Sequence, residues 1–373
     1  TKLGWTGSLN LNGSAFTIDS LNVGCLAQLG SVRELSLASN GLREILPENA
    51  TTDPVSGTGC EIKQTIQKKT TSDLDSGLMR KLSSLVSLDL RNNSIRNFRV
   101  PPNGLLFRPI LQRFALQSGN DGGFRFPINL AENDLDEIGV TGDTGKTSDA
   151  WLSLFRHSQG MARRVFALGA AWTDTDLARF ARMLPGSKVK LLNLVGSAFS
   201  STGISALATS LHTSNVTDLD LASCKLDDKA LQKLASVFGN WHPVRLRLIN
   251  NYFAEQGMVA LAEGLQSLTR TGTKTLTYLD LSLNPRIGDR GVVALSGGLN
   301  GSSVRTLFLE QCKVGVAGAE ALGTALTNSS MEVLKLGPLE KSGHAAILRM
   351  LPHPQLVRID VRLEREIHME ISW

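Results

Sequence analysis

The sequence has few aromatic residues, no long apolar run and no concentrated charge. Aromatic residues make up 5% of the chain, and no run of 18 or more apolar residues occurs, so we expect no membrane span. Lysine and arginine form no block of five or more, and aromatic residues are not interleaved with them. The formal net charge of +5 is small for 373 residues. We therefore do not expect nucleic acid as a partner.

Cysteine and histidine are also scarce, and their spacing argues against a metal or redox centre. The cysteines are Cys25, Cys60, Cys224 and Cys312, and none belongs to a CxxC pair. The six histidines lack metal-ligand spacing, and the sequence offers no serine–histidine–aspartate set. We predict no catalytic residues, no metal and no cofactor, so the chain is predicted not to be an enzyme.

One glycine-rich segment, residues 139–147, resembles a phosphate-binding loop. A Walker A motif has a glycine five residues before its final Gly-Lys pair, and this chain has Val140 there. Asp136 and Glu137 also interrupt any apolar strand leading into the segment. We interpret it as a solvent loop before a helix that begins near Asp149.

Leucine is abundant and regularly spaced. The pattern L-x-x-L-x-L-x-x-(N/C)-x-L recurs from about residue 189 to residue 361. Its central leucines are 27 or 28 residues apart, except for one step of 33 that contains the polar stretch 269–274, which we interpret as a surface loop extension. These leucines are Leu192, Leu219, Leu246, Leu279, Leu307 and Leu334.

The second half of each unit has helical periodicity. Residues 203–211 and 257–265 both begin with glycine and carry leucine four and eight residues later, which places apolar side chains on one helical face. A strand and helix of about 27 residues cannot bury their own apolar surfaces, so the units must stack. Because helices are about 10 Å wide and strands about 4.8 Å apart, the stack bends. We predict an α/β solenoid, or horseshoe, with a parallel sheet on its concave face and helices on its convex face.

These residues resemble the ribonuclease-inhibitor-like class of leucine-rich repeat proteins over roughly residues 166–361. The resemblance implies that the Asn/Cys position of each repeat points inward and bonds backbone groups where the chain leaves the strand. It favours a structural role for Asn40, Asn93, Asn133, Cys224, Asn251, Asn284 and Cys312 over a catalytic or metal-binding one.

The two ends of the chain depart from this pattern. Looser copies occur at 35–42, 85–95 and 128–135, with an opening copy at 9–11 and an inserted loop near 46–80. We therefore predict irregular repeats over 1–150, ribonuclease-inhibitor-like repeats over 151–358 and a strand-like cap over 359–373. Alternating apolar residues favour strands in that cap, with residues 364–366 turning a hairpin. The alternative is a strand offered to a partner's sheet.

Residues beside the strand leucines point away from the predicted core. At these positions in successive repeats, which form columns across the sheet, the sequence has tyrosine, phenylalanine and arginine, residue types enriched at binding hot spots. For any one of these residues, the alternative is that it is simply a solvated side chain on a sheet of mixed charge. The candidate partner-binding residues are Arg245, Arg247, Tyr278, Asp280, Phe308, Glu310, Lys335, Arg358 and Arg362.

These columns predict a non-catalytic protein–protein interaction module, or a scaffold subunit of a larger assembly, that holds a protein partner on its concave face. Two alternatives stay open. One is a regulatory protein, such as a small-GTPase activator, an immune sensor or a bacterial effector, since similar repeats occur in these. The other is an extracellular or cell-surface recognition protein.

The compartment depends on conflicting signals. Six N-x-S/T sequons, at Asn12, Asn49, Asn92, Asn215, Asn300 and Asn328, and a disulfide between Cys25 and Cys60 would fit secretion. The absence of a cysteine-rich cap, and the mostly intracellular distribution of the family that the chain resembles, favour an intracellular, cytoplasmic location.

Overall fold

The computed structural model describes residues 162–168, 172–273 and 275–339, together with shorter strand segments and single residues elsewhere. The chain divides into two compact units, Thr1–Phe166 and Ala167–Trp373, which are described separately. Strand β8 (Arg164–Leu168) spans their boundary. The boundary expected near residue 150 and the loop expected near 46–80 lie outside the described residues.

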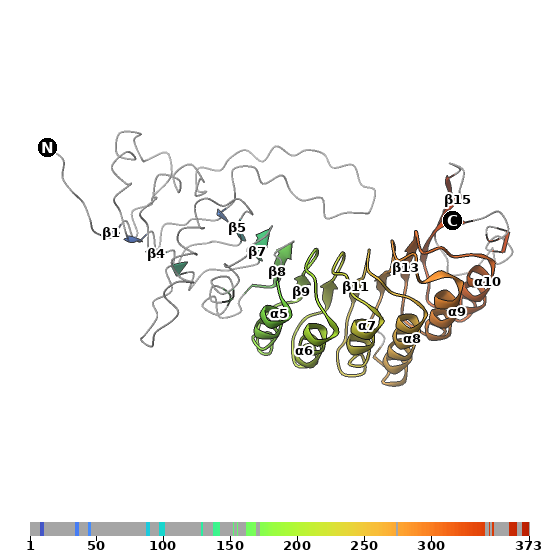
Figure 1. Cartoon of the computed structure of the whole chain (residues 1–373), viewed down its shortest axis with the longest axis horizontal. Helices are drawn as coiled ribbons and strands as arrows, with labels where there is room; N and C mark the ends of the chain where they lie inside the picture. The colour runs from blue at the N-terminus through green and yellow to red at the C-terminus, as the bar shows by residue number, and fades with distance from the viewer. Residues whose placement is uncertain are drawn as a thin grey trace. The chain divides into compact units, whose positions relative to one another are not determined.

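The second unit alternates strands with helices (Figure 1). The strands β9 to β15 are parallel, and β16 pairs with β15 in the antiparallel direction. They are β9 (Leu191–Asn193), β10 (Asp218–Asp220), β11 (Arg245–Arg247), β12 (Tyr278–Asp280), β13 (Thr306–Glu310), β14 (Val333–Leu339), β15 (Arg358–Leu363) and β16 (His368–Ser372).

The helices of this unit form a single layer on one side of the strands (Figure 1). They are α5 (Asp174–Ala181), α6 (Ser201–Leu211), α7 (Asp228–Ala235), α8 (Glu255–Arg270), α9 (Gly288–Leu299) and α10 (Val316–Leu326). Among the described residues, no helix is long and apolar enough to cross a membrane.

The register of the sheet follows the leucine pattern of the sequence. Leu219 is paired with Leu192 on one side and Leu246 on the other, and the same column continues through Leu279, Leu307 and Leu334 to Ile359. All of these side chains are at most 2% exposed. Burying one leucine contributes about 2 kcal/mol, so this column and the helix leucines opposite it account for much of the stability.

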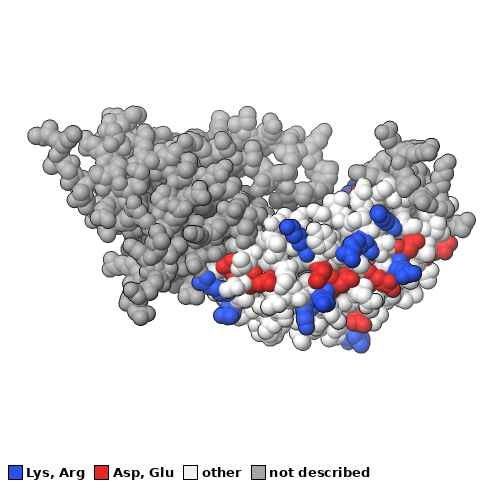
Figure 2. Space-filling model, in the orientation of Figure 1, with Lys and Arg blue, Asp and Glu red and all other residues white. Residues whose placement is uncertain are grey.

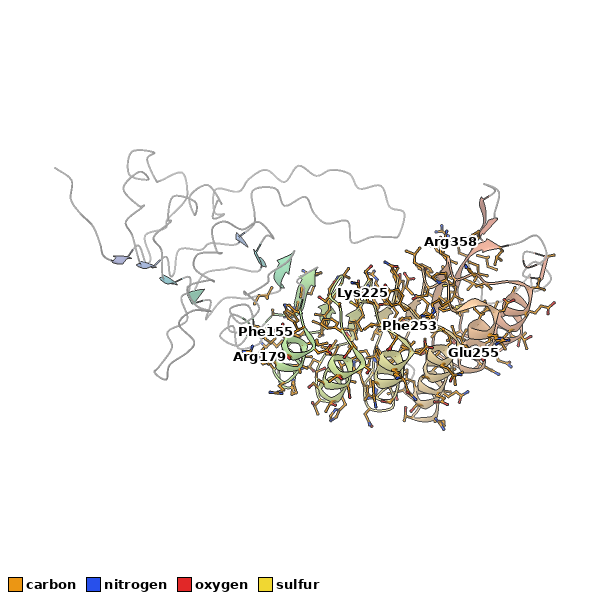
Figure 3. The ribbon with its side chains drawn as sticks, in the orientation of Figure 1. Phe155, Arg179, Lys225, Phe253, Glu255 and Arg358 are labelled. Carbon is orange, nitrogen blue, oxygen red and sulfur yellow. The ribbon has the colours of Figure 1, made fainter. Side chains whose placement is uncertain are left out.

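The core lies between the sheet and the helices. Leu207, Leu234, Leu261, Leu295 and Leu322 face the strands from five successive helices and are buried. Phe253, labelled in Figure 3, is fully buried between the two layers. The indole of Trp241 is also buried, and its Nε1–H donates to the carbonyl of Val216 at 2.7 Å.

The one long repeat is accommodated by a longer helix. Helix α8 has 16 residues and reaches Arg270, so the expected loop extension begins only at Thr271. Thr271 caps the helix, and Gly272 follows with φ of +72°, a conformation in which glycine is favoured. The prediction of a loop over the whole stretch 269–274 was therefore wrong for Thr269 and Arg270, because helical hydrogen bonding continues through them.

The Asn/Cys position forms a buried hydrogen-bonded ladder, as the resemblance to ribonuclease-inhibitor-like repeats implies. Asn251 accepts from the backbone N–H groups of Cys224 and Leu226, and its amide donates to the carbonyls of Leu221 and Leu248. Asn284 accepts from the backbone N–H of Asn251 at 2.8 Å. The column therefore links each turn to the next. The asparagines expected at 40, 93 and 133 lie outside the described residues.

The two cysteines of this ladder are buried thiols. The Cys224 Sγ donates to the carbonyl of Leu194 at 3.2 Å, and the Cys312 Sγ donates to that of Leu281 at 3.1 Å. Burial raises the pKa of both thiols to about 12. Both are therefore protonated at neutral pH, which agrees with a structural role.

A second set of contacts joins the helices of neighbouring repeats. The Asp228 carboxylate, in the first turn of α7, accepts the backbone N–H of Ala254, the N-cap residue of α8, at 2.7 Å. Asp174 bonds Ser200 and Asp289 bonds Gly315 in the same way. Each of these aspartates also lies beside a glycine of the next helix, and these glycines are Gly203, Gly257 and Gly318.

Glycine is required at these positions for a steric reason. A Cβ on Gly257 would lie 2.5 Å from the Asp228 Oδ1. The glycine that opens the helical half of the repeat in the sequence therefore makes room for the carboxylate of the preceding repeat.

The first unit contains two sets of parallel strands. One sheet has the order β1 (Ser8–Asn10), β2 (Glu34–Ser36), β4 (Ser87–Asp89) and β6 (Ile128–Asn129), and it pairs the leucines of the looser copies, Leu9 with Leu35 and Leu35 with Leu88. The other set is β3 (Glu44–Ile45), β5 (Asn97–Val100) and β7 (Glu137–Thr141). Within the described residues, these copies thus carry a second short strand after the leucine strand.

Strand β7 also corrects the interpretation of the glycine-rich segment. Its Gly139 and Val140 pair with Arg99 and Val100 of β5, so residues 139–141 belong to a strand and not to a solvent loop. Cross-strand pairing here outweighs the charged residues that precede it. Residues 142–151 lie outside the described residues.

Candidate functional site

The candidate residues lie on the strand face, which we define as the side of β9 to β15 that is turned away from the helices. Because side chains alternate along a strand, the residues on either side of each buried leucine point to this face. The sheet register aligns them in two columns. The first contains Asp218, Arg245, Tyr278, Thr306, Val333 and Arg358, and the second contains Asp220, Arg247, Asp280, Phe308, Lys335 and Asp360.

Arg247 connects three strands of this face. Its guanidinium lies 3.5 Å from the Asp220 carboxylate on β10 and 5.6 Å from the centre of the Tyr278 ring on β12. Burial lowers the pKa of Arg247, but the charge of Asp220 and the interactions with the Tyr278 side chain outweigh that effect, so the pKa is raised overall. Arg247 is therefore a fixed cation whose position is set by its neighbours.

An aromatic pair follows on the next two strands. The rings of Tyr278 and Phe308 meet edge to face, with centroids 5.4 Å apart. The ammonium of Lys335 on β14 lies 4.7 Å from the centre of the Phe308 ring. Together with Arg247, these residues form a row across β11 to β14 in which two aromatic rings lie between two cations.

Two candidate residues are less accessible than the sequence pattern suggests. Phe308 is 6% exposed and Asp280 is 5% exposed. Tyr278 and Lys335 pack against Phe308, and Asp280 accepts the backbone N–H of Ser282 at 3.0 Å and the hydroxyl of Tyr278 at 3.4 Å. The expectation that Phe308 is an exposed contact residue was wrong, because its neighbours cover it.

The pKa values of Asp220, Asp280 and Tyr278 on this face are all raised. Burial raises the pKa of Asp280 and of Asp220, against the opposing effects of backbone hydrogen bonds and of Arg247. Burial, with the nearby charge of Asp280, also raises the pKa of Tyr278 to about 12. Tyr278 therefore keeps its hydroxyl proton at neutral pH and can donate it.

The remaining candidates lie around this row. The Arg245 side chain is 60% exposed and its Nε lies 3.6 Å from Asp218 Oδ1. Glu310 and Arg358 are half-buried. Arg362 pairs through its backbone with His368 of β16, and its side chain lies outside the described residues. The structure thus links Arg247, Tyr278 and Lys335 through ring contacts that include the buried Phe308, and Arg245 is paired with Tyr278 in the sheet register.

This arrangement suits recognition. Among the described residues, no group of three or more potential metal-binding side chains occurs. Figure 2 shows basic and acidic side chains interspersed on the visible face of the second unit. Paired charges and stacked cations hold the strand-face side chains in place before any partner arrives, which lowers the entropy lost on binding.

Two exposed apolar side chains were missed by the sequence interpretation. Tyr252 is 52% exposed and Leu283 is 46% exposed, and both lie in the turns that follow β11 and β12. The signal for Tyr252 was its rarity, since the chain has only two tyrosines. Leu283 was hidden because it sits among the leucines of its own repeat.

Comparison with known families agrees with this architecture. The model of the family described as Leucine Rich repeat matches residues 212–235 and 274–296. Together with the repeated strand–helix units, these matches identify the second unit as an α/β leucine-rich-repeat solenoid. No curated protein matches the sequence.

Several solved structures resemble the chain at low identity. They include the actin-binding site 2 of leiomodin-1 (15% identity, 54% of this chain and 86% of that chain, TM-score 0.30). The yeast Rad7–Elc1 complex (14%, 93% and 75%, TM-score 0.40) is another. A third is an internalin of Listeria monocytogenes (13%, 87% and 80%, TM-score 0.34). At these TM-scores the likenesses carry no argument about function.

Proposed function

We propose that this chain is a non-catalytic protein-interaction module that binds a protein partner on its strand face. The observation that carries the proposal is the row of cationic and aromatic groups across β11 to β14, in which Arg247 and Lys335 stack on Tyr278 and Phe308. Arginine and tyrosine are the residue types that most often dominate the energy of protein interfaces.

The solenoid supports this role physically. Strands fixed by backbone pairing and by the Asn/Cys ladder hold the side chains at constant spacing, so the partner meets an ordered surface. Arg245, which is exposed beside the row, adds a charge that a partner carboxylate can pair with.

We further propose that the repeats belong to the ribonuclease-inhibitor-like class. Support comes from the spacing of 27 or 28 residues, from a helix in every described repeat of the second unit, and from asparagine and cysteine at one ladder position. Within that class we favour a free-standing binder or a subunit of a larger assembly.

The test uses substitutions that spare the core. Arg245→Ala, Arg247→Ala and Lys335→Ala are made together, and partners captured from the native source by the unmodified chain are identified and purified. The triple variant is expected to bind such a partner at least about 100-fold more weakly, since each such residue contributes about 1 kcal/mol or more. Circular dichroism checks that the variant is folded.

A matched control changes the helix side of the same unit. Arg290→Ala alters an exposed cation on α9, and it is expected to leave partner affinity unchanged. Unchanged affinity in the folded triple variant would contradict the strand-face proposal.

We also propose an intracellular location. Three of the sequon asparagines, Asn215, Asn300 and Asn328, are exposed in the structure, so glycosylation would reach them in a secreted protein. Intact mass of the native protein, before and after treatment with glycosidase and with reductant, tests this. A mass lost to glycosidase would place the chain in the secretory route.

A further inference from the structure

A second surface lies at the carboxyl ends of the strands. We define the turn edge as residues 223–227, 250–254, 283–287 and 311–315, which follow β10 to β13 and precede α7 to α10. Tyr252 and Leu283 are exposed there by 52% and 46%. The other large apolar side chains exposed among the described residues are three valines on the helices, Val259, Val293 and Val316.

The backbone fixes these two side chains on successive turns. The backbone N–H of Asn251 donates to the Asn284 side chain at 2.8 Å, which ties the two turns together. The backbone N–H of Tyr252 donates to the carbonyl of Leu226 at 2.8 Å, and that of Leu283 donates to the carbonyl of Glu310 at 2.7 Å. Neither side chain depends on a flexible loop for its position.

Leu283 is an unusual residue for its backbone conformation. Its φ is +61°, in the left-handed region, where branched apolar residues are disfavoured. The equivalent positions in the other turns carry glycine or polar residues, namely Gly196, Ser223, Asn250 and Gln311, with φ between +53° and +78°. A half-exposed leucine therefore occupies a place where the fold itself favours a small or polar residue.

The charges around the pair are mostly positive. Lys225, which is labelled in Figure 3, Arg286 and Lys313 are exposed on the turn edge, and among the described residues none of them pairs with a carboxylate. The aspartates nearby are already engaged by helix N-termini. The Asp227, Asp228 and Asp289 carboxylates accept backbone N–H groups of Ala230, Ala254 and Gly315 at 2.9, 2.7 and 2.6 Å.

We propose that the turn edge is a second docking surface, which binds an acidic peptide segment of a protein partner. An aromatic or aliphatic side chain of that segment packs against Tyr252 and Leu283, and its carboxylates face Lys225, Arg286 and Lys313. A nucleic acid fits this surface less well, because three separated cations and one aromatic ring offer neither a continuous basic track nor a stacking platform.

This proposal goes beyond the strand-face function, because no strand-face residue belongs to the turn edge. The test begins with random 12-residue peptides displayed on phage and selected on the whole chain. Selected peptides are synthesised with a fluorescent label, and their affinities are measured by anisotropy. Peptides with a net charge of about −3 or below and at least one large apolar residue are the expected outcome.

The variants then locate the binding site. Leu283→Asn combined with Tyr252→Ser is expected to lower peptide affinity at least about 10-fold, and Asn keeps the left-handed backbone that position 283 needs. Lys225→Glu with Lys313→Glu is expected to lower it by a similar factor and to flatten its dependence on salt. Val293→Ser, which removes an exposed valine from α9, is the matched control and is expected to change nothing.

Three results would overturn the proposal. One is a selection that yields only neutral or basic peptides, and another is an acidic peptide whose affinity survives both turn-edge variants. The third is preferential binding of an oligothymidine strand, or of vesicles containing phosphatidylserine, that the same variants abolish. A peptide whose affinity is lost in the Arg245→Ala, Arg247→Ala and Lys335→Ala variant, but kept in both turn-edge variants, would instead bind the strand face. The two proposals can therefore fail separately.

Discussion

Position 283 shows how one residue can be poorly matched to its backbone. Leucine in the left-handed region costs about 1 kcal/mol relative to residues that tolerate it, and Leu283 is too exposed to regain that cost by burial. Asparagine occupies the equivalent position 250, where its side chain donates to the Ser223 hydroxyl at 3.0 Å.

We therefore expect Leu283→Asn to stabilise the protein by about 0.5–1 kcal/mol. Urea denaturation, followed by circular dichroism, measures this as a higher midpoint with an unchanged slope. The matched control is Leu283→Ala, which shortens the side chain but keeps a residue unsuited to the left-handed region, and it should give no such gain. Equal midpoints for the asparagine and alanine variants would contradict the explanation.

Asp280 gives a pH-dependent prediction. Burial raises its pKa above the value of 3.8 that it has when exposed, so the folded state favours the protonated form. Its contribution to stability is therefore complete below pH 3.8 and is lost as pH rises through the higher pKa of the folded state. Asp280→Asn should be more stable than the unmodified chain at pH 7, and this difference should vanish as the pH approaches 3.8.

Free energies of unfolding between pH 3.5 and pH 7.5 measure this difference. Asparagine can still accept the backbone N–H of Ser282, which makes the substitution conservative. Asp220→Asn serves as a contrast, because it also removes the carboxylate that pairs with Arg247, and its gain at pH 7 should be smaller. A difference for Asp280→Asn that is independent of pH would contradict the assignment.

At the scale of the element, neighbouring repeats cap one another. The N-cap residue of helix α8 is Ala254, which cannot cap the helix with its own side chain, and Asp228 of the preceding helix accepts the backbone N–H of Ala254. The N-terminus of a helix leaves such N–H groups without partners inside the helix. The stack of helices is thus coupled through side chains as well as through the apolar core.

Asp228→Ala is expected to destabilise the chain by about 1 kcal/mol, the usual cost of losing an N-cap bond. Ala254→Ser in the same chain gives α8 a capping side chain of its own, and this double variant should recover most of the loss. Thermal unfolding followed by circular dichroism measures both. If the serine recovers nothing, the carboxylate stabilises α8 in another way.

The regular elements were predictable where one residue type determines them. The leucine column fixed the strands and their register, because a shift by one residue would expose every leucine. The Asn/Cys ladder was expected from the resemblance to ribonuclease-inhibitor-like repeats. The length of α8 and the second strands β3, β5 and β7 were not predictable, since the first depends on where helical bonding stops and the second on pairing between distant segments.

The candidate site was predictable only in part, for a related reason. Alternation along a strand tells which face Arg245, Arg247 and Tyr278 are on. It does not tell how far a neighbour covers a residue, and Phe308 is buried by side chains on the strands on either side of it. The turn edge depends on a backbone conformation at Leu283 that no pattern of apolar residues reveals.

At the scale of the whole molecule, a solenoid is stabilised mainly by contacts between adjacent repeats. Cooperative unfolding of the second unit therefore depends on links such as the Asn/Cys ladder and the aspartate contacts, which join each repeat to the next. Cys224 and Cys312 report on this directly, because they lie in the repeats of β10 and β13, both are fully buried, and burial raises the pKa of each to about 12.

In a chain with Cys25→Ser and Cys60→Ser, we expect neither remaining thiol to react with a disulfide reagent at neutral pH until urea unfolds the second unit. Only the thiolate reacts, and burial both suppresses it and blocks access. Mass spectrometry of labelled peptides measures each site separately as urea is increased.

If the links make the repeats one cooperative body, Cys224 and Cys312 become reactive at the same urea concentration. Separate midpoints would show that the repeats between them unfold one after another, and Asp289→Ala, which removes a link between α9 and α10, should then separate the midpoints further.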